Sequence, residues 1–292
     1  MAQRRSERAV LIAGPTASGK SALALQRARE MGGVIINADA MQVYNVLRVV
    51  TARPAAADLA AAPHRLYGTV SPGERFSTGA WRAAAAGMMA EEAGRPLIFV
   101  GGTGLYFEAL NKGFAEVPPV PAAVVAGIEA ELAGLDAPGR LSLLQARDPA
   151  MAARLQAPDP QRVARALAVL ATTGRSLADF QDDTQAGLLE GFEVERIVLN
   201  PDRAVLADRI ARRFAVMVEN GAVEEVEALS RLGLDPALPA MKAIGVREIS
   251  AWRRGELSEG EAIERAVIAT RQYAKRQRTW FRGRMADWRW IE

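Results

Sequence analysis

The sequence predicts an α/β fold in which helices cover both faces of a parallel sheet and a helical domain is inserted between two strands. Short, continuous apolar runs alternate with helical patterns, as in parallel sheets whose strands are buried on both faces. Near the start of the chain, one such run leads through a glycine-rich turn into a helical pattern. Residues 118–191, in contrast, contain only helical patterns.

Four apolar segments are predicted to form the strands. The first contains Leu11 and Ile12 and precedes a helical pattern over residues 22–30. The other three are residues 34–38 (VIINA), 97–100 (LIFV) and 196–199 (RIVL). The chain after the fourth strand is predicted to be helical. Its last helix begins after the capping-box pair Ser258 and Glu261 and continues to about residue 282.

The inserted helical domain is predicted from a change in pattern along the chain. The stretch from residue 118 opens with a proline-rich PPVP segment and has no strand-like run. Asp159 and Pro160 have the pattern of an N-cap followed by proline in the first helical turn. We therefore divide the chain into residues 1–117 (first part of the core), 118–191 (inserted domain) and 192–292 (completion of the core and basic C-terminal helices).

A phosphate-binding loop is the strongest functional signal in the sequence. Residues 14–21 read GPTASGKS and match G-x-x-x-x-G-K-[ST] in full, with a predicted strand before them and a helix after them. In such a loop, backbone N–H groups and a helix N-terminus surround phosphate oxygens, a lysine reaches the phosphates and a hydroxyl can hold Mg²⁺. The predicted phosphate-binding residues are Gly14, Pro15, Thr16, Ala17, Ser18, Gly19, Lys20 and Ser21, and Ser21 is also the predicted Mg²⁺ ligand. The expected fold therefore resembles that of the P-loop NTPases.

Two further strand ends should face this loop, because ligands bind beyond the carboxyl ends of parallel strands. Asp39 follows the second strand, and Gly101, Gly102 and Thr103 follow the third. Many P-loop hydrolases have a metal-binding aspartate after such a strand, whereas the third strand here ends in glycines. Three roles are therefore open for Asp39: a metal ligand, a helix cap, or a general base beside the phosphate site.

The composition excludes several kinds of site. The chain of 292 residues contains no cysteine and one histidine, His64, so disulfides and thiolate metal sites are excluded and a zinc site is not expected. No apolar run approaches the ~20 residues that span a bilayer. The apolar segment near the start runs directly into the glycine-rich loop and is interpreted as a strand, so we expect a cytoplasmic protein.

Positive charge is concentrated near the C-terminus. The net charge is +3 overall, but residues 271–292 contain seven Lys or Arg against two acidic residues. Arg271, Lys275, Arg278 and Arg282 recur at helical spacing and would form one basic surface, the C-terminal stripe. Such a stripe is typical of a surface that binds a polyanion, although a solvated helix face has the same pattern.

Six segments together resemble the tRNA dimethylallyltransferases, in the order of that family and over nearly the whole chain. The segments are GPTASGKS, NADAMQVY, FVGGTGLYFEAL, DPQRVARALAV, MKAIGVREI and TRQYAKRQRTWFR. The resemblance implies transfer of a dimethylallyl group from dimethylallyl diphosphate to the exocyclic amine of the adenosine 3′-adjacent to the anticodon, with release of diphosphate. It implies Mg²⁺ as cofactor and the anticodon stem-loop of tRNA as partner. We expect a monomer that does not bind membranes.

The resemblance also implies roles for individual residues. Asp39 matches the family's general base, and Thr103 and Arg213 match residues that hold the diphosphate and its developing charge. Segments that contact tRNA match Asp39, Ala40, Met41 and Gln42, and also Gln161, Arg162, Val163, Ala164 and Arg165; to these we add the C-terminal stripe. Two positions depart from the family pattern, since Ala40 stands where serine is usual and Val125 where an arginine often contacts RNA.

Three other functions are compatible with parts of the sequence. A small-molecule kinase would use the same phosphate loop, but an aspartate after the third strand is missing. An isopentenyltransferase acting on free adenine nucleotides would share the loop and Asp39 but would not need the C-terminal stripe. A non-catalytic RNA-binding protein would have no special use for Asp39 and Thr103.

Overall fold

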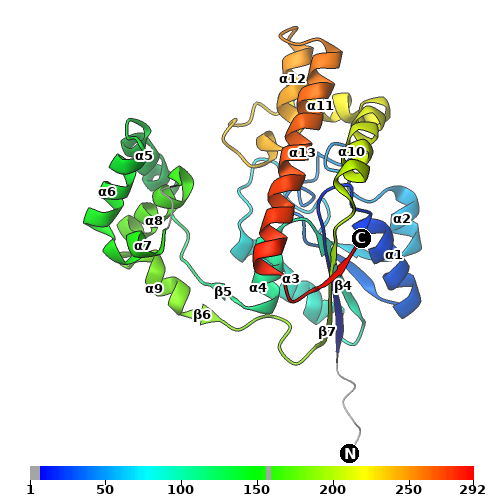
Figure 1. The fold of residues 1–292 in the computed structure, drawn as a ribbon, viewed down its shortest axis with the longest axis horizontal. Helices are drawn as coiled ribbons and strands as arrows, with labels where there is room; N and C mark the ends of the chain where they lie inside the picture. The colour runs from blue at the N-terminus through cyan, green and yellow to red at the C-terminus, as the bar shows by residue number, and fades with distance from the viewer. Residues whose placement is uncertain (1–6, 156–158) are drawn as a thin grey trace, which may run out of the picture. The chain divides into compact units, whose positions relative to one another are not determined.

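The computed structural model describes residues 7–155 and 159–292. Its centre is a six-stranded sheet in which every pair of neighbouring strands is parallel (Figure 1). The strand order is β3-β2-β4-β1-β7-β8, so the first strand of the chain lies between β4 and β7. The strands are β1 (Arg8–Ala13), β2 (Val34–Asn37), β3 (His64–Arg65), β4 (Leu97–Gly101), β7 (Glu193–Leu199) and β8 (Arg289–Ile291).

Helices cover both faces of this sheet. Successive residues of a strand point to opposite faces, and in β1 Leu11 belongs to one buried apolar cluster while Val10 and Ile12 belong to another. Helix α1 packs into the cluster of Val10, whereas α3, α4 and α13 pack into the cluster of Leu11. The helices of the first half of the chain are α1 (Lys20–Met31), α2 (Ala56–Ala61), α3 (Thr78–Glu91) and α4 (Gly104–Asn111). The predicted fold class is confirmed.

The two edge strands of the sheet are not predicted from the sequence. Strand β3 contains two residues and β8 contains three, so neither is long enough to show an apolar run. Their position is set by long-range pairing, since β3 pairs with β2 and β8 with β7. The four strands predicted from their sequences are the four inner strands β2, β4, β1 and β7.

The last third of the chain is helical up to β8, as predicted. Its elements are α10 (Arg203–Met217), η1 (Val218–Ala222), α11 (Val223–Arg231), η2 (Ala240–Lys242), α12 (Val246–Arg253) and α13 (Glu259–Arg284). The predicted capping box is present at the start of α13, because the Ser258 N–H donates to Glu261 Oε2 at 2.8 Å and the Glu261 N–H donates to Ser258 Oγ at 3.3 Å. Helices α10 and α13 lie side by side (Figure 1).

A second compact unit spans Lys112–Gly187 and has its own apolar core. Its helices are α5 (Ala122–Ala133), α6 (Ala137–Arg147), α7 (Pro149–Arg154), α8 (Pro160–Thr173) and α9 (Leu177–Asp182). The unit also contains an antiparallel pair, β5 (Phe114–Ala115) and β6 (Thr184–Gln185). Strand β6 lies within residues 118–191, where the sequence predicts only helices, and β5 lies just before that range. The unit therefore begins and ends a few residues before the predicted limits at 118 and 191.

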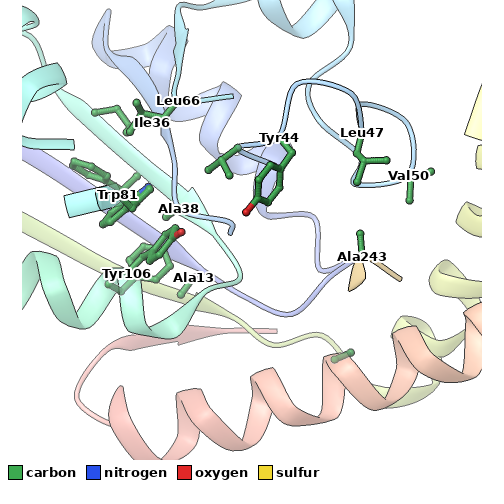
Figure 2. Close-up of a cluster of buried hydrophobic side chains, with 14 of the residues drawn as sticks. Ala13, Ile36, Ala38, Tyr44, Leu47, Val50, Leu66, Trp81, Tyr106 and Ala243 are labelled. Atoms are coloured by element: carbon green, nitrogen blue, oxygen red, sulfur yellow. The ribbon is translucent and has the colours of Figure 1, made fainter. Parts of the chain in front are cut away.

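The loop that follows β2 is anchored in the apolar core that packs on the central sheet. Tyr44, Leu47 and Val50 of this loop belong to the same buried cluster as Ala38 at the end of the sheet (Figure 2). Beneath them, the indole of Trp81 stacks on Tyr106, with ring centroids 4.1 Å apart. The Trp81 indole N–H donates to the Asn37 carbonyl at 2.9 Å, so the core also fixes the last residue of β2. No helix within the described residues is long and apolar enough to cross a membrane.

Strand β4 ends in glycine because its end lies against the backbone that follows β2. A Cβ atom at Gly101 would lie 1.9 Å from the Ala38 carbonyl oxygen, far inside van der Waals contact. The same two segments are joined by a hydrogen bond from the Thr103 N–H to the Ala38 carbonyl at 3.2 Å. The glycine therefore allows two neighbouring strand ends to approach closely.

We expect Gly101→Ala to lower the free energy of unfolding by about 1–3 kcal/mol or more, because the new methyl group would overlap the Ala38 backbone. Gly87→Ala is the matched control, since Gly87 is exposed in α3 and its added Cβ would meet no atom within 4 Å. That control should stabilise the protein by about 0.5–1 kcal/mol. Urea-induced unfolding of both variants measures the difference, and equal stabilities would contradict this explanation of Gly101.

Candidate functional site

The loop between β1 and α1 has a backbone shape that suits an oxyanion. Ala17 and Gly19 have positive φ angles of 62° and 93°, which curve the chain around a concave surface. Helix α1 begins at Lys20, so its N-terminus also faces this concavity. The Ser18 hydroxyl is buried without a hydrogen-bond partner in the described part of the chain. The loop thus presents donors that a phosphate could satisfy.

Not every residue of the predicted phosphate loop faces the ligand space. Ala17, Ser18, Gly19, Lys20 and Ser21 line a cavity, whereas Gly14 and Pro15 are buried. The N–H of Thr16 donates to Gln277 Oε1 at 2.9 Å, and the N–H of Ser18 donates to the Pro15 carbonyl at 3.2 Å. The N–H groups of Thr16 and Ser18 are therefore paired within the protein, whereas the Ser18 hydroxyl has no partner among the described residues.

Two cavities of about 510 and 340 Å³ adjoin at the carboxyl edge of the sheet and share Lys20, Ser21 and Arg213 in their walls. The basic residues that line them are Lys20, Arg209, Arg213, Lys242 and Arg276. Asp39 is the one acidic residue among the described residues that line either cavity. The combined space therefore carries an excess of positive charge and suits an anion.

The smaller cavity has an apolar wall as well as its charged residues. This wall consists of Val50, Ile210, Phe214, Met217, Ala243 and Ile244. Ile210, Phe214 and Met217 recur at helical spacing on α10, the helix that also carries Arg213. One helix therefore places a cation beside the phosphate loop and apolar side chains next to it. The cavity suits a ligand with an anionic end and a small apolar end.

Charges inside the site interact strongly. Burial lowers the pKa of Lys20 to about 8, although the Asp39 carboxylate opposes this shift and the Arg213 cation adds to it. Burial also lowers the pKa of Arg213, and the Asp39 carboxylate again opposes the shift. The Lys20 ammonium donates to the Pro15 carbonyl at 3.3 Å. An anion between the two cations would replace the solvation that burial removes.

Asp39 and Thr103 are held together by hydrogen bonds between their loops. Asp39 Oδ1 accepts from the Met41 N–H at 3.0 Å, which fixes the orientation of the carboxylate. Thr103 Oγ1 accepts from the Ala40 N–H at 2.9 Å. Asp39 lines the smaller cavity, but Thr103 is absent from the described residues that line either cavity. In this structure the Thr103 hydroxyl supports the loop of Asp39.

The residues after Asp39 have distinct positions. Ala40 uses only its backbone N–H toward Thr103, so the serine hydroxyl usual in the family is not required for that contact. Met41 lines the smaller cavity. Gln42 also lines it, and its side-chain amide donates to the carbonyls of Thr51 and Ala52 at 2.8 and 3.0 Å. Gln42 therefore shapes the cavity wall formed by the following loop.

A carboxylate of α11 holds the same loop from its other side. Glu225 accepts hydrogen bonds from the backbone N–H groups of Arg48, Val49 and Val50 at 2.7–3.1 Å. Charged acceptors form some of the stronger hydrogen bonds in proteins. The wall that contains Val50 and Thr51 is thereby tied to the helices of the last third of the chain.

The predicted RNA-binding positions on α8 divide into two groups. Gln161, Arg162 and Arg165 are exposed at the start of that helix. Val163 and Ala164 are buried in the apolar core of the second unit, so their side chains do not reach the surface. Val125, on α5, packs against the same core. The exposed polar residues are the ones available for RNA.

The C-terminal stripe and the cavity lie on different sides of α13. Thr270, Tyr273 and Arg276 line the smaller cavity. Arg282 follows Tyr273 by nine residues, about two and a half helical turns, so it points to the opposite side. Arg271 donates to the Ala207 carbonyl of α10 at 3.5 Å, on the side of the stripe. The stripe is thus a separate surface from the cavity wall.

Several residues of the site are missed by reasoning from the sequence alone, namely the apolar wall and four polar residues. Lys242, Tyr273 and Arg276 line the cavity, and Gln277 contacts the phosphate loop. The sequence of α13 shows a periodicity of apolar and basic residues, but this periodicity indicates the C-terminal stripe and not the residues that line the cavity. Tyr273 and Gln277 lie one turn apart, on the side of the helix that faces the sheet, where only the folded structure shows what they contact.

Comparisons with known proteins show which family the chain resembles. Residues 42–284 match the family model described as IPP transferase. The chain is 52% identical over 290 residues to the tRNA dimethylallyltransferase of Mesorhizobium japonicum, covering 97% of this chain and 89% of that protein. The solved tRNA isopentenylpyrophosphate transferase of Bacillus halodurans is similar with a TM-score of 0.67 and 32% identity, over 98% of this chain and 89% of that one. A eukaryotic dimethylallyltransferase solved acting on tRNA gives a TM-score of 0.79 and 26% identity, over 94% and 70%.

The lowered pKa of Lys20 predicts a proton uptake on anion binding. The free protein holds this side chain as an ammonium below about pH 8 and as a neutral amine above it. A bound anion stabilises the ammonium, so at about pH 9 wild-type protein should take up more protons on binding inorganic diphosphate than Lys20→Met does. At about pH 6.5 the two should not differ. Calorimetric titration in buffers of different ionisation enthalpy gives the uptake, and equal values at high pH would rule out this role for Lys20.

Proposed function

The chain belongs to the IPP transferase family, and we propose that it transfers a dimethylallyl group from dimethylallyl diphosphate to tRNA, releasing diphosphate. The acceptor is the exocyclic amine of the adenosine 3′-adjacent to the anticodon. One observation carries the proposal: a phosphate loop, an excess of cations, an apolar wall and one carboxylate line two adjoining cavities. Relatives named tRNA dimethylallyltransferase support the substrates.

The leaving group is the diphosphate, and the cations hold it. Lys20 and Arg213 line both cavities, and the Ser18 hydroxyl has no other partner within the described chain. Negative charge grows on the bridging oxygen as the carbon–oxygen bond breaks. Preorganised donors and cations in a partly desolvated site stabilise that charge and need little rearrangement during the reaction. Lys20, Arg213 and the loop amides supply this stabilisation.

The apolar wall accounts for the five-carbon group. Phe214, Met217 and Ile244 offer a surface on which a branched alkenyl chain loses contact with water. Exclusion of water also protects an allylic centre, because water would compete with the amine as nucleophile. The same wall adjoins Arg213, so the reacting carbon would lie between the cations and the apolar residues.

Asp39 is the general base of the proposed reaction. The lone pair of the adenosine amine forms a bond to the allylic carbon while the bond to the diphosphate oxygen breaks and its electron pair leaves with diphosphate. The amine nitrogen then carries an extra proton, which passes to the Asp39 carboxylate. The hydrogen bond from the Met41 N–H orients Asp39 Oδ1, so the proton is proposed to pass to the other oxygen of this carboxylate. Such proton transfer contributes typically ~10²–10⁴-fold.

Mg²⁺ is proposed to enter with the diphosphate. Ser21 lines both cavities beside Lys20 and is an exposed residue, as suits a metal ligand in a phosphate loop. The described residues contain no group of three or more His, Cys, Asp or Glu that could hold a metal alone. This suits Mg²⁺, which keeps several waters and is commonly shared between one or two protein ligands and phosphates. Bound there, it would neutralise charge on the departing diphosphate.

The tRNA is proposed to bind through exposed basic and polar residues. Arg162 and Arg165 lie one turn apart on α8, and the C-terminal stripe runs along α13. Such residues contact phosphates and supply affinity that falls with salt. Bases of an anticodon loop can be splayed out of the stack at a cost of about a few kcal/mol. An adenosine flipped in this way could reach Asp39 in the cavity.

Asp39→Asn should lower the single-turnover rate of transfer by about 10²–10⁴-fold, because an amide cannot accept the proton. The fold should persist, since the amide oxygen still accepts from the Met41 N–H. Asp287→Asn, at an exposed position after α13, is the control and should transfer at the wild-type rate. Labelled dimethylallyl diphosphate with excess enzyme and tRNA gives the rates. A near-wild-type rate in Asp39→Asn would remove the general base from the proposal.

The same assay separates this function from its alternatives. Wild-type protein should label tRNA and should leave AMP unlabelled. Transfer to AMP at a comparable rate would identify an enzyme of free nucleotides. Consumption of ATP with phosphorylation of the acceptor would identify a kinase.

The C-terminal stripe should supply tRNA affinity and not chemistry. Changing Arg271, Lys275, Arg278 and Arg282 together to glutamine should weaken tRNA binding and flatten the slope of log K against log[salt] by about 3. The affinity for dimethylallyl diphosphate should stay the same, because the stripe lies on the other side of α13 from the cavity. Neutralising Arg231 and Arg247, which are exposed on α11 and α12, is the control. Titrations at three salt concentrations decide, and an unchanged slope would make the stripe ordinary surface.

A further inference from the structure

The side chain of Gln277 joins two strand ends of the active site. Its Oε1 accepts from the Thr16 N–H of the phosphate loop at 2.9 Å. Its Nε2 donates to the Gly102 carbonyl, just after β4, at 3.0 Å. The residue is 5% exposed and lies about two turns before the C-terminal end of α13. One buried amide therefore bridges the loop that follows β1 and the turn that follows β4.

Both ends of this amide have a defined chemistry. Thr16 offers a backbone N–H, which can only donate, and Gly102 offers a carbonyl, which can only accept. The bridge thus requires a side chain with an acceptor and a donor on adjacent atoms. A carboxylate would satisfy Thr16 but would face the Gly102 carbonyl without a proton, and an apolar side chain would satisfy neither.

The glycines after β4 leave room for α13. A Cβ at Gly102 would lie 2.1 Å from Gln277 Nε2, and a Cβ at Gly104 would lie 2.0 Å from Trp280 Nε1. Gln277 and Trp280 are three residues apart and so occupy neighbouring positions on one face of the helix. The glycines therefore leave the space that these two side chains fill, and a larger residue at either position would displace one of them.

The bridge continues to the general base. Gly102 precedes Thr103, whose hydroxyl accepts from the Ala40 N–H at 2.9 Å and whose own N–H donates to the Ala38 carbonyl at 3.2 Å. Ala38 and Ala40 flank Asp39. A continuous chain of hydrogen bonds thus runs from the phosphate loop through Gln277 and the β4 turn to the loop of Asp39.

We propose that Gln277 is a positioning residue for the transfer reaction, which sets the separation between the diphosphate-binding loop and the loop of the general base. Gln277 lies on α13, so the helix that carries the C-terminal stripe also fixes the position of the phosphate loop relative to the loop of Asp39. This inference rests on the proposed function. Small errors in the distance between reacting groups lower rates strongly, even when each group is present.

The first test replaces Gln277 by a side chain that can donate a hydrogen bond only at low pH. Gln277→Glu should reduce the single-turnover rate about tenfold to a hundredfold at neutral and higher pH, because the ionised carboxyl cannot donate to Gly102. The loss should shrink as pH falls and the introduced carboxyl gains a proton. The hydroxyl of Tyr273 is the titratable group that interacts with Gln277. The charges of Asp39, Arg276 and Tyr106 in turn influence the pKa of Tyr273. Wild type measured in parallel corrects for their own titration.

Gln272→Glu is the matched control, because Gln272 is exposed on the same helix. It should follow the wild-type pH profile. Rates are expressed per folded protein, with folding followed by circular dichroism. A rate for Gln277→Glu within about twofold of wild type at every pH, or a loss that does not change with pH, would overturn the inference. Failure of wild type itself to transfer would instead overturn the proposed function.

The second test uses the close contact between Gly102 and Gln277. Gly102→Ala should lower the transfer rate at least about tenfold in the wild-type background, since the methyl group would displace the amide. In the Gln277→Ala background the methyl group has space, so the same change should cost little more. An equal cost in both backgrounds would mean that Gly102 acts independently of Gln277, and would contradict the bridge.

Discussion

Parallel pairing of β2, β4, β1 and β7 is the constraint on which the site depends. Parallel strands all end at the same edge, so the loops after these strands meet there although they are far apart in the sequence. The phosphate loop follows β1, Asp39 follows β2, the glycine-rich turn follows β4, and α10 with Arg213 follows β7. The glycines at the end of β4 then determine how closely the neighbouring segments approach. A change in the register of one strand would separate groups that must act on the same molecule.

The charges at this edge are unbalanced, and the imbalance favours an anionic ligand. Lys20 and Arg213 each lose solvation on burial, and Asp39 compensates each of them only in part. Since neither cation is neutralised by a second acidic residue among the described cavity walls, an incoming anion completes the site. The apolar wall of α10 then determines which anion fits, because a ligand with an apolar end gains from burial and a simple phosphate does not. Helix α10 carries Arg213 and also three residues of the apolar wall, so one helix contributes both to charge recognition and to shape recognition.

Much of the architecture is readable from the sequence because it is local. The four inner strands are continuous apolar runs, the phosphate loop is a contiguous pattern, and the family resemblance is confirmed by the match to IPP transferases. The edge strands β3 and β8 are different, since two or three residues form a strand only when a neighbour is available for pairing. The periodicity of α13 revealed its exposed basic side. It could not reveal that Gln277 contacts Thr16, a residue 261 positions earlier in the chain.

Individual residues in a matched segment need not share a role. Val163 and Ala164 belong to a segment expected to contact tRNA, yet they pack in the core of their own unit while Arg162 and Arg165 are exposed. Thr103 belongs to the predicted diphosphate site, yet its hydroxyl accepts a hydrogen bond from the loop of Asp39. Its assignment to the diphosphate stays a prediction. A sequence pattern identifies the segment, and the direction of each side chain then depends on helical phase and on neighbours from distant strands.

In the proposed reaction Asp39 serves as a base beside an anion held by cations, and not as a ligand of the metal. Removal of its charge should then relieve repulsion of the anion. The most direct measurement is the affinity of wild type and Asp39→Asn for inorganic diphosphate in the presence of Mg²⁺, by calorimetry. We expect severalfold tighter binding in the variant, since a full charge a few ångströms away contributes about 1 kcal/mol or more even in high dielectric. If the variant instead binds diphosphate more weakly than wild type does, and this loss requires Mg²⁺, then Asp39 is a metal ligand and not the base.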